Sequence, residues 1–286
     1  MSIIKTIFVT GATGNQGGAV VRNLLDKGFH IKALTRNAAS EKAKALSVQP
    51  GVEVIEGTFD KPASFSAHLK DVDGVFSVQS FEQGTKKEIQ QGIALADYAK
   101  SSGVPHFMYS SVYYADMQTG VPHFDSKKVV EDHIKSIGLP YTILRPASMY
   151  ENFLIPQVRS RILKGKLVSP LGKHTTIAML AADDIGRIAA IVFGQKENYN
   201  NKTITLASEA LDVEQTAAIF SEGMGKPVKY AKLPGIITRL AMGKDLYKMF
   251  KWEDANNGKD NLDITALHNQ FPGMIGLHEW IPLFFK

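Results

Sequence analysis

The chain has 286 residues, of which 44% are hydrophobic and 21% charged, with 33 basic and 28 acidic side chains giving a net charge of +5. This composition supports a full hydrophobic core and excludes the disordered and fibrous classes. The sequence contains no cysteine, which excludes disulfides, thiolate metal sites and cysteine nucleophiles. We therefore expect redox chemistry to come from an organic cofactor, with no metal.

The basic charge does not by itself indicate a nucleic-acid partner. Lysines and arginines are scattered along the chain, and no nucleic-acid-binding motif accompanies them. No apolar run reaches the roughly 18 residues that a membrane span needs. Residues 1–5 lead directly into a strand pattern instead of a signal peptide. The sequence therefore predicts a soluble, cytoplasmic protein that contacts neither membrane nor nucleic acid.

Short β-branched and aromatic runs alternate with helical patterns over the first 145 residues. The predicted strands cover 6–10, 31–35, 52–55, 74–78, 106–110 and 141–145. The longer predicted helices run over about 86–102 and about 125–137. On the second of these, one face carries Val129, Val130, His133, Ile134 and Ile137. Because parallel strands need crossovers, the alternation predicts an α/β fold with a Rossmann-type, doubly wound parallel sheet.

The alternation loosens after residue 150, where proline and glycine become frequent, and one further strand is predicted at 203–206. We expect residues 1–154 to form an NAD(P)-binding Rossmann domain, with 171–207 returning to it. Residues 155–170 and 208–286 would form a smaller C-terminal substrate or cap domain over the cofactor.

Three glycines follow the first predicted strand and precede a helical pattern: Gly11, Gly14 and Gly17. In a dinucleotide-binding turn the first glycine permits the tight turn, the second lets the backbone approach the pyrophosphate, and the third lets helix and strand pack closely. The phosphates then lie at the positive end of the helix. A glycine turn without a ligand is the alternative, and the strand, turn and helix order favours the dinucleotide.

The end of the second predicted strand distinguishes the two nicotinamide dinucleotides. NAD-binding proteins usually have a carboxylate there for the ribose 2′-hydroxyl, whereas this chain has Arg36. A guanidinium matches the 2′-phosphate of NADP. The pattern predicts that NADP(H) is preferred over NAD(H), unless Arg36 is an ordinary surface residue.

At this point the chain resembles a known family. The stretches 10–18, 35–37, 123–127 with Glu131, and 149–152 are similar to those of the NmrA-like branch of the atypical short-chain dehydrogenase/reductases, particularly its redox-sensor subgroup. The resemblance extends over essentially the whole chain. It implies a Rossmann fold with a small C-terminal substrate domain and a preference for NADP.

The resemblance also implies roles for individual residues. The pyrophosphate would lie on Gly11, Ala12, Thr13, Gly14, Asn15 and Gln16, and the 2′-phosphate on Arg36. The adenine would lie near Gly57, Thr58 and Phe59. The ribose would have Val78, Gln79 and Ser80 alongside it. Lys127 would reach the nicotinamide ribose, and the nicotinamide would be flanked by Met149, Tyr150, Glu151 and Asn152. Gln90 departs from the family pattern, in which close relatives carry a lysine that adds a cofactor contact.

The proton donor is the open part of the site. Ordinary short-chain reductases place a tyrosine four residues before the lysine, whereas this chain has His123 there, ahead of Lys127. A histidine titrates near neutral pH and can donate a proton to a carbonyl or quinone, and Tyr113 and Tyr114 are the other candidates. The alternatives are a helix-capping role for His123 and plain packing for the two tyrosines.

Two functions follow from this pattern. The first is an NADPH-dependent oxidoreductase that transfers hydride to a small carbonyl, quinone or conjugated substrate. The second is a non-catalytic NADP(H) redox sensor that acts through a regulatory protein partner. The lysine favours the enzyme and the missing tyrosine favours the sensor; we take the enzyme as the first hypothesis.

Overall fold

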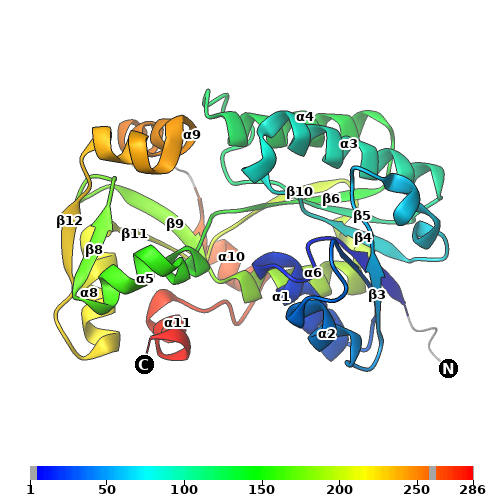
Figure 1. Cartoon of the computed structure of the whole chain (residues 1–286), viewed down its shortest axis with the longest axis horizontal. Coiled ribbons are helices and arrows are strands. Elements are labelled where there is room, and N and C mark those ends of the chain that lie inside the picture. The colour runs from blue at the N-terminus through cyan, green and yellow to red at the C-terminus, as the bar shows by residue number, and fades with distance from the viewer. Residues whose placement is uncertain (1–4, 258–261, 286) are drawn as a thin grey trace. The chain divides into compact units, whose positions relative to one another are not determined.

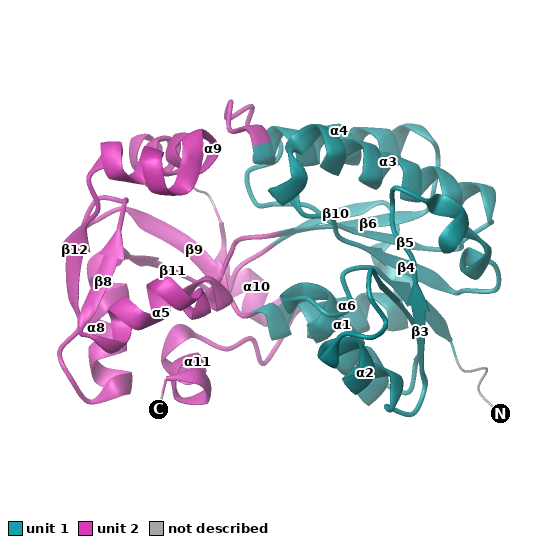
Figure 2. Ribbon diagram, in the orientation of Figure 1, with its two compact units in different colours: residues 1–116, 123–145, 182–205 teal, residues 117–122, 146–181, 206–286 magenta. Residues whose placement is uncertain are grey.

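The computed structural model describes residues 5–257 and 262–285, and its chain divides into two compact units (Figure 2). Unit 1 comprises residues 1–116, 123–145 and 182–205, and unit 2 comprises 117–122, 146–181 and 206–286. The expected division differs from this one at 117–122, 146–154, 171–181 and 206–207, which belong to unit 2. Pairing accounts for part of the difference: β9 (Thr176–Leu180) pairs with β7 (Ser148–Met149) on one side and with β11 (Glu209–Asp212), from the expected second domain, on the other.

A seven-stranded sheet forms the centre of unit 1, in the order β10-β6-β5-β4-β1-β2-β3. Neighbouring strands from β3 to β6 are all parallel. The strands are β1 (Thr6–Val9), β2 (His30–Thr35), β3 (Val52–Glu56), β4 (Gly74–Ser77), β5 (Phe107–Ser110), β6 (Tyr141–Pro146) and β10 (Lys202–Leu206). The predicted Rossmann-type sheet is confirmed, and each predicted strand lies within one residue of an observed one at both ends.

Helices cover both faces of this sheet, as a doubly wound fold requires (Figure 1). One face carries α3 (Thr85–Ser101) and α4 (Pro122–Ser136); the other carries α1 (Asn15–Asp26), α2 (Glu41–Ser47) and α6 (Ala182–Gly194). Short helical segments complete the unit: η1 (Pro62–Ser64), η2 (Ser66–Leu69), η3 (Phe81–Gln83) and α7 (Lys196–Tyr199). The core between the sheet and α3 and α4 includes the fully buried Phe107, Val130 and Ile143.

Unit 2 is built from two small sheets and several helices. Strands β11 (Glu209–Asp212), β9 and β7 form one sheet, and β12 (Lys229–Lys232) pairs in parallel with β8 (Lys166–Ser169) in the other. Its helices are η4 (Tyr150–Leu154), α5 (Pro156–Leu163), α8 (Val213–Met224), α9 (Gly235–Ala255), α10 (Ile264–Gln270) and α11 (Leu277–Phe284). Phe220 and Trp280 are buried in its core. Across the described part of the chain, no helix is long and apolar enough to span a bilayer.

Helix α4 begins three residues before its predicted start. Pro122 occupies its first position, which suits proline because the missing N–H has no helical partner there. His123 therefore lies in the first turn of the helix instead of in the preceding loop. The buried face of α4 also differs from the expected one, since Val129 is 47% exposed while Lys127 and Glu131 are buried.

Candidate functional site

The glycine loop lies between β1 and α1, at the carboxyl end of the first strand. Gly11 has a φ of 60°, the left-handed region that favours glycine. At Gly17 a Cβ atom would lie 2.2 Å from Gly11 O and 2.7 Å from Thr10 O, so strand and helix could not pack as they do. At Gly14 a Cβ would meet Gly11 O at 3.2 Å, and this residue is exposed.

Two contacts tie the glycine loop to the ends of neighbouring strands. The Thr10 hydroxyl accepts a hydrogen bond from Val78 N (2.8 Å), just after β4. Ser110 Oγ, at the end of β5, donates to Gln16 Oε1 (2.6 Å). The carboxyl ends of β1, β4 and β5 therefore meet at one edge, where open α/β sheets bind their ligands.

The predicted adenine and 2′-phosphate residues lie at the ends of β2 and β3. Arg36, directly after β2, is exposed. Gly57 is packed against Ser64, whose hydroxyl accepts a hydrogen bond from Thr58 N (3.0 Å). Phe59 and Gln90 both line a groove of about 620 Å³. This groove is also bordered by the basic side chains of Lys86 and Lys87.

The side chain of Lys127 is only 9% exposed, and its ammonium is directed to groups on other elements. Its Nζ donates to Gln79 O (3.0 Å) and lies 2.9 Å from Glu88 Oε1. It also lies 5.5 Å from the centre of the Tyr109 ring. Burial, and then the negative charges of Glu88 and Glu131, raise the pKa of Tyr109 well above 10, so its hydroxyl stays protonated.

The three proton-donor candidates belong to one aromatic group around the start of α4. The His123 ring stacks on Phe81 at 4.6 Å and is 7% exposed. Phe124 contacts both the His123 ring and the Tyr114 ring. Tyr114 is buried and stacks on the half-buried Tyr113 at 4.2 Å. The structure thus brings the three candidates together without distinguishing one as donor.

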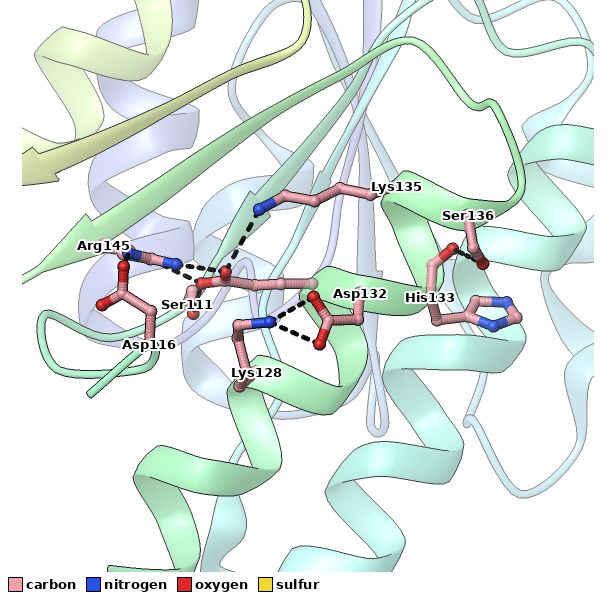
Figure 3. Close-up of polar contacts among 9 residues, drawn as sticks. Ser111, Asp116, Lys128, Asp132, His133, Lys135, Ser136 and Arg145 are labelled. Carbon is pink, nitrogen blue, oxygen red and sulfur yellow. Dashed lines mark hydrogen bonds and ion pairs between the residues drawn. The ribbon is translucent and has the colours of Figure 1, made fainter. Parts of the chain in front are cut away.

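An ionic network fixes the loop that carries the two tyrosines (Figure 3). Arg145, at the end of β6, holds Glu131 of α4 in a bidentate contact, through Nε to Oε1 (2.9 Å) and Nη2 to Oε2 (2.6 Å). Its Nη1 binds Asp116, at the far end of the loop. Ser111, at the near end, donates its hydroxyl to Glu131 Oε1. Burial lowers the pKa of Arg145 but Glu131 and Asp116 raise it more, so the guanidinium stays charged.

The residues predicted to flank the nicotinamide belong to unit 2. Tyr150 is fully buried, packs against Trp280 at 5.6 Å and donates its hydroxyl to Glu209. Glu151 accepts a hydrogen bond from Trp280 Nε1 (3.3 Å), and the exposed Asn152 donates to Ser148. Met149 ends β7 and is half-buried. For Tyr150 the geometry shows a packing role in the core of unit 2.

Sequence reasoning did not single out Glu88, which is fully buried against Lys127. No local signal marks it, because Thr85-Lys86-Lys87-Glu88 has the pattern of a solvated first helical turn. Within residues 5–257 and 262–285, no cluster of histidine and acidic side chains could hold a metal ion.

The comparisons with known proteins agree with this architecture. The chain is 30% identical over 255 residues to an NmrA-like family domain-containing oxidoreductase, malD, of Malbranchea aurantiaca, covering 80% of this chain and 76% of that one. It is also 30% identical over 270 residues to the nitrogen metabolite repression protein nmr of Neurospora crassa, covering 80% of this chain and 55% of that one. Among solved structures, the NADPH-dependent quinone oxidoreductase QOR2 of Escherichia coli, complexed with NADPH, matches with a TM-score of 0.81 and 26% identity, covering 98% of this chain and 100% of that one. The NmrA-like family model matches residues 4–280, and the chain therefore belongs to the NmrA-like family.

Proposed function

We propose that this chain is an NADPH-dependent oxidoreductase of the atypical short-chain dehydrogenase/reductase type, acting on a small carbonyl, quinone or conjugated substrate. The observation that supports this most is the position of the Lys127 ammonium. It is bonded to Gln79 O, one residue after Val78, which is itself bonded to the glycine loop through Thr10. A buried ammonium and a dinucleotide-type loop thus share one sheet edge.

The residues of the loop fit a dinucleotide. The exposed backbone at Gly14, with no side chain, leaves space for a pyrophosphate to approach the start of α1. In this assignment residues 11–16 hold the pyrophosphate, Arg36 the 2′-phosphate, 57–59 the adenine and 78–80 the ribose. The 149–152 stretch flanks the nicotinamide, with Tyr150 anchoring it in the core of unit 2. Arg36 makes NADP(H) the preferred cofactor, because a guanidinium favours a phosphate over a hydroxyl.

In the reaction the bound nicotinamide supplies the hydride, and the chain supplies orientation and a proton. Lys127 binds the nicotinamide ribose, and its positive charge favours negative charge that develops on a nearby oxygen. His123, one turn before Lys127 on α4, is our first candidate for the proton donor. Tyr113 and Tyr114 are the alternatives. The names of two similar proteins, an oxidoreductase and an NADPH-dependent quinone oxidoreductase, support this reaction class.

A second function, a non-catalytic NADP(H) sensor acting through a protein partner, has one observation in its favour. His123 occupies the place of the usual tyrosine, and its buried ring stacks on Phe81 and meets Phe124 edge-on. A donor enclosed in this way reaches a substrate oxygen poorly. The similarity to a repression protein points in the same direction.

NADPH consumption, followed at 340 nm against a panel of quinones, aldehydes and enones, separates the two functions. We expect turnover with at least one substrate. Lys127→Met should lower turnover by about 100-fold or more, while weakening NADPH binding much less, because acid–base support contributes on the order of 10²–10⁴-fold. Tight NADPH binding without consumption of NADPH across pH 6–8 would instead establish the sensor.

A further inference from the structure

Glu88 is a fully buried carboxylate in the first turn of α3. Burying a charge in this way is costly unless a partner of opposite charge and further hydrogen bonds compensate it. The start of a helix helps, because its dipole favours negative charge. Because burying this carboxylate costs free energy, we expect specific neighbouring groups to compensate its charge.

Both neighbours of Glu88 come from α4. Glu88 Oε1 lies 2.9 Å from Lys127 Nζ, and Glu88 Oε2 accepts a hydrogen bond from Ser126 Oγ (2.5 Å). The two carboxylate oxygens are thus divided between consecutive residues of one helix turn, which fixes the plane of the carboxylate as well as its position. This pair lies entirely within unit 1.

The contacts of Lys127 determine where its ammonium points. An ammonium has three donors. Lys127 Nζ donates a hydrogen bond to Gln79 O (3.0 Å) and lies 2.9 Å from Glu88 Oε1 as an ion pair, without the geometry of a hydrogen bond. Because Gln79 and Glu88 lie on different elements, these two contacts together hold the ammonium in one position.

The surroundings of this pair supply no substitute for Glu88. Three buried oxygens have no hydrogen-bond partner among the described residues: Gln79 Oε1, Glu88 Oε1 and the hydroxyl of Tyr109. Gln79 accepts a hydrogen bond from the Lys127 ammonium only through its backbone oxygen. The uncharged ring of Tyr109 faces the ammonium, with its centre 5.5 Å from Lys127 Nζ. Glu88 is therefore the carboxylate in contact with Lys127.

We propose that Glu88 is the positioning residue of the site: its carboxylate balances the charge of Lys127 and holds the ammonium within reach of the nicotinamide ribose. This inference rests on the proposed function, in which Lys127 contacts the cofactor. Glu88 itself does not touch the cofactor in this proposal. Its whole effect passes through Lys127.

A double-mutant cycle on NADPH affinity tests the proposal. NADPH is titrated by its fluorescence into the parent chain, Glu88→Gln, Lys127→Met and the double variant, each first shown to be folded by thermal melting. Glu88→Gln should weaken NADPH binding roughly tenfold, the size expected for one lost charge-assisted contact. In the Lys127→Met background the same change should have no further effect.

Asp97→Asn is the matched control. Asp97 on α3 also bonds to α4, through His133 (2.7 Å), but this pair lies at the surface. Removing its charge should leave the affinity for NADPH unchanged. Glu88→Asp, which keeps the charge on a shorter side chain, should recover part of the loss caused by Glu88→Gln.

The outcomes separate the two proposals. If Lys127→Met leaves the affinity for NADPH unchanged, the cofactor contact of Lys127 is wrong, and the proposed function loses its main support. If Lys127→Met weakens binding but Glu88→Gln does not, or if the two losses simply multiply in the double variant, the positioning role of Glu88 is wrong. Should Glu88→Gln fail to fold, Ser126→Ala replaces it in the cycle, with a smaller loss that must again vanish in the Lys127→Met background.

Discussion

Gly14 and Gly17 lie one helical turn apart, but the structure predicts opposite consequences for changing them. Gly14 has extended backbone angles (φ −93°, ψ −178°), which any residue can adopt. A Cβ there meets Gly11 O at 3.2 Å, a tight contact that a shift of a few tenths of an ångström relieves. Because valine also caps a helix less well than glycine, Gly14→Val should cost about 1 kcal/mol. Its side chain would nevertheless occupy the space that the pyrophosphate needs.

At Gly17 the clash is with backbone atoms, which cannot rotate away. A Cβ would lie 2.2 Å from Gly11 O and 2.5 Å from Gly11 C, so α1 would have to move by about 1 Å from β1 to restore ordinary contact distances. We expect Gly17→Ala to cost at least about 1–3 kcal/mol of unfolding free energy, the range for overpacked cores.

Thermal and urea unfolding with and without NADPH measures both effects. At a ligand concentration of 100 times Kd, binding stabilises the parent chain by about 2.7 kcal/mol. Gly14→Val should lose this gain, while the ligand-free chain should lose only about 1 kcal/mol of stability. Gly18→Ala, whose Cβ would meet Ala12 O at 3.3 Å inside the first turn of α1, is the matched control and should keep the gain. If NADPH still stabilises Gly14→Val, the pyrophosphate does not lie on this loop.

Two further predictions concern cofactor preference and pH. Arg36→Ala should weaken NADPH binding about tenfold and leave NADH binding nearly unchanged, in the same fluorescence titration; equal losses for both cofactors would contradict the 2′-phosphate contact. Burial, and then the charge of Lys196, lowers the pKa of His106 from 6.5 to about 4. On acidification the unfolded chain therefore binds the proton before the folded chain does. The free energy of unfolding should fall by up to about 3 kcal/mol as the pH drops from 6.5 to about 4. Urea unfolding of His106→Gln, which keeps a polar group near Thr142, should lack this decline, and a decline as steep as that of the parent chain would refute the assignment.

The sheet could be predicted from the sequence because its signals are local. Each strand of the β1–β6 series is a short run of β-branched or aromatic residues, and the crossover rule orders such runs without further information. The glycine loop was recognisable for the same reason, since strand, turn and helix are consecutive. The predicted start of α4 is three residues too late, because the helix begins at Pro122 and proline suits a first helical position.

The ionic contacts of the site could not be predicted, because they join residues that are distant in sequence. Glu88 and Lys127 are separated by 39 positions, and only the packing of α3 beside α4 brings them together. Ser110 and Gln16 are separated by 94. Helical periodicity fails here for a physical reason: it identifies a buried face by apolar residues, whereas a charged residue is buried when a partner compensates it.

Helix α4 has buried charged residues that helical periodicity does not identify. Lys127 and Glu131 are one turn apart and both are buried, next to Val130 and Ile134, so the inner face of the helix combines apolar and ionic residues. Each charge has a partner outside the helix: Lys127 pairs with Glu88, and Glu131 pairs with Arg145 and with Ser111 on the loop of the two tyrosines. Within the helix, Glu131 Oε2 also lies 3.8 Å from Lys135 Nζ. The Lys127–Glu88 and Glu131–Arg145 pairs both involve α4, but they have no residue in common. A change at Glu88 should therefore act on the lysine and a change at Glu131 on the tyrosine loop, so the cofactor contact and the candidate proton donors Tyr113 and Tyr114 can be perturbed separately.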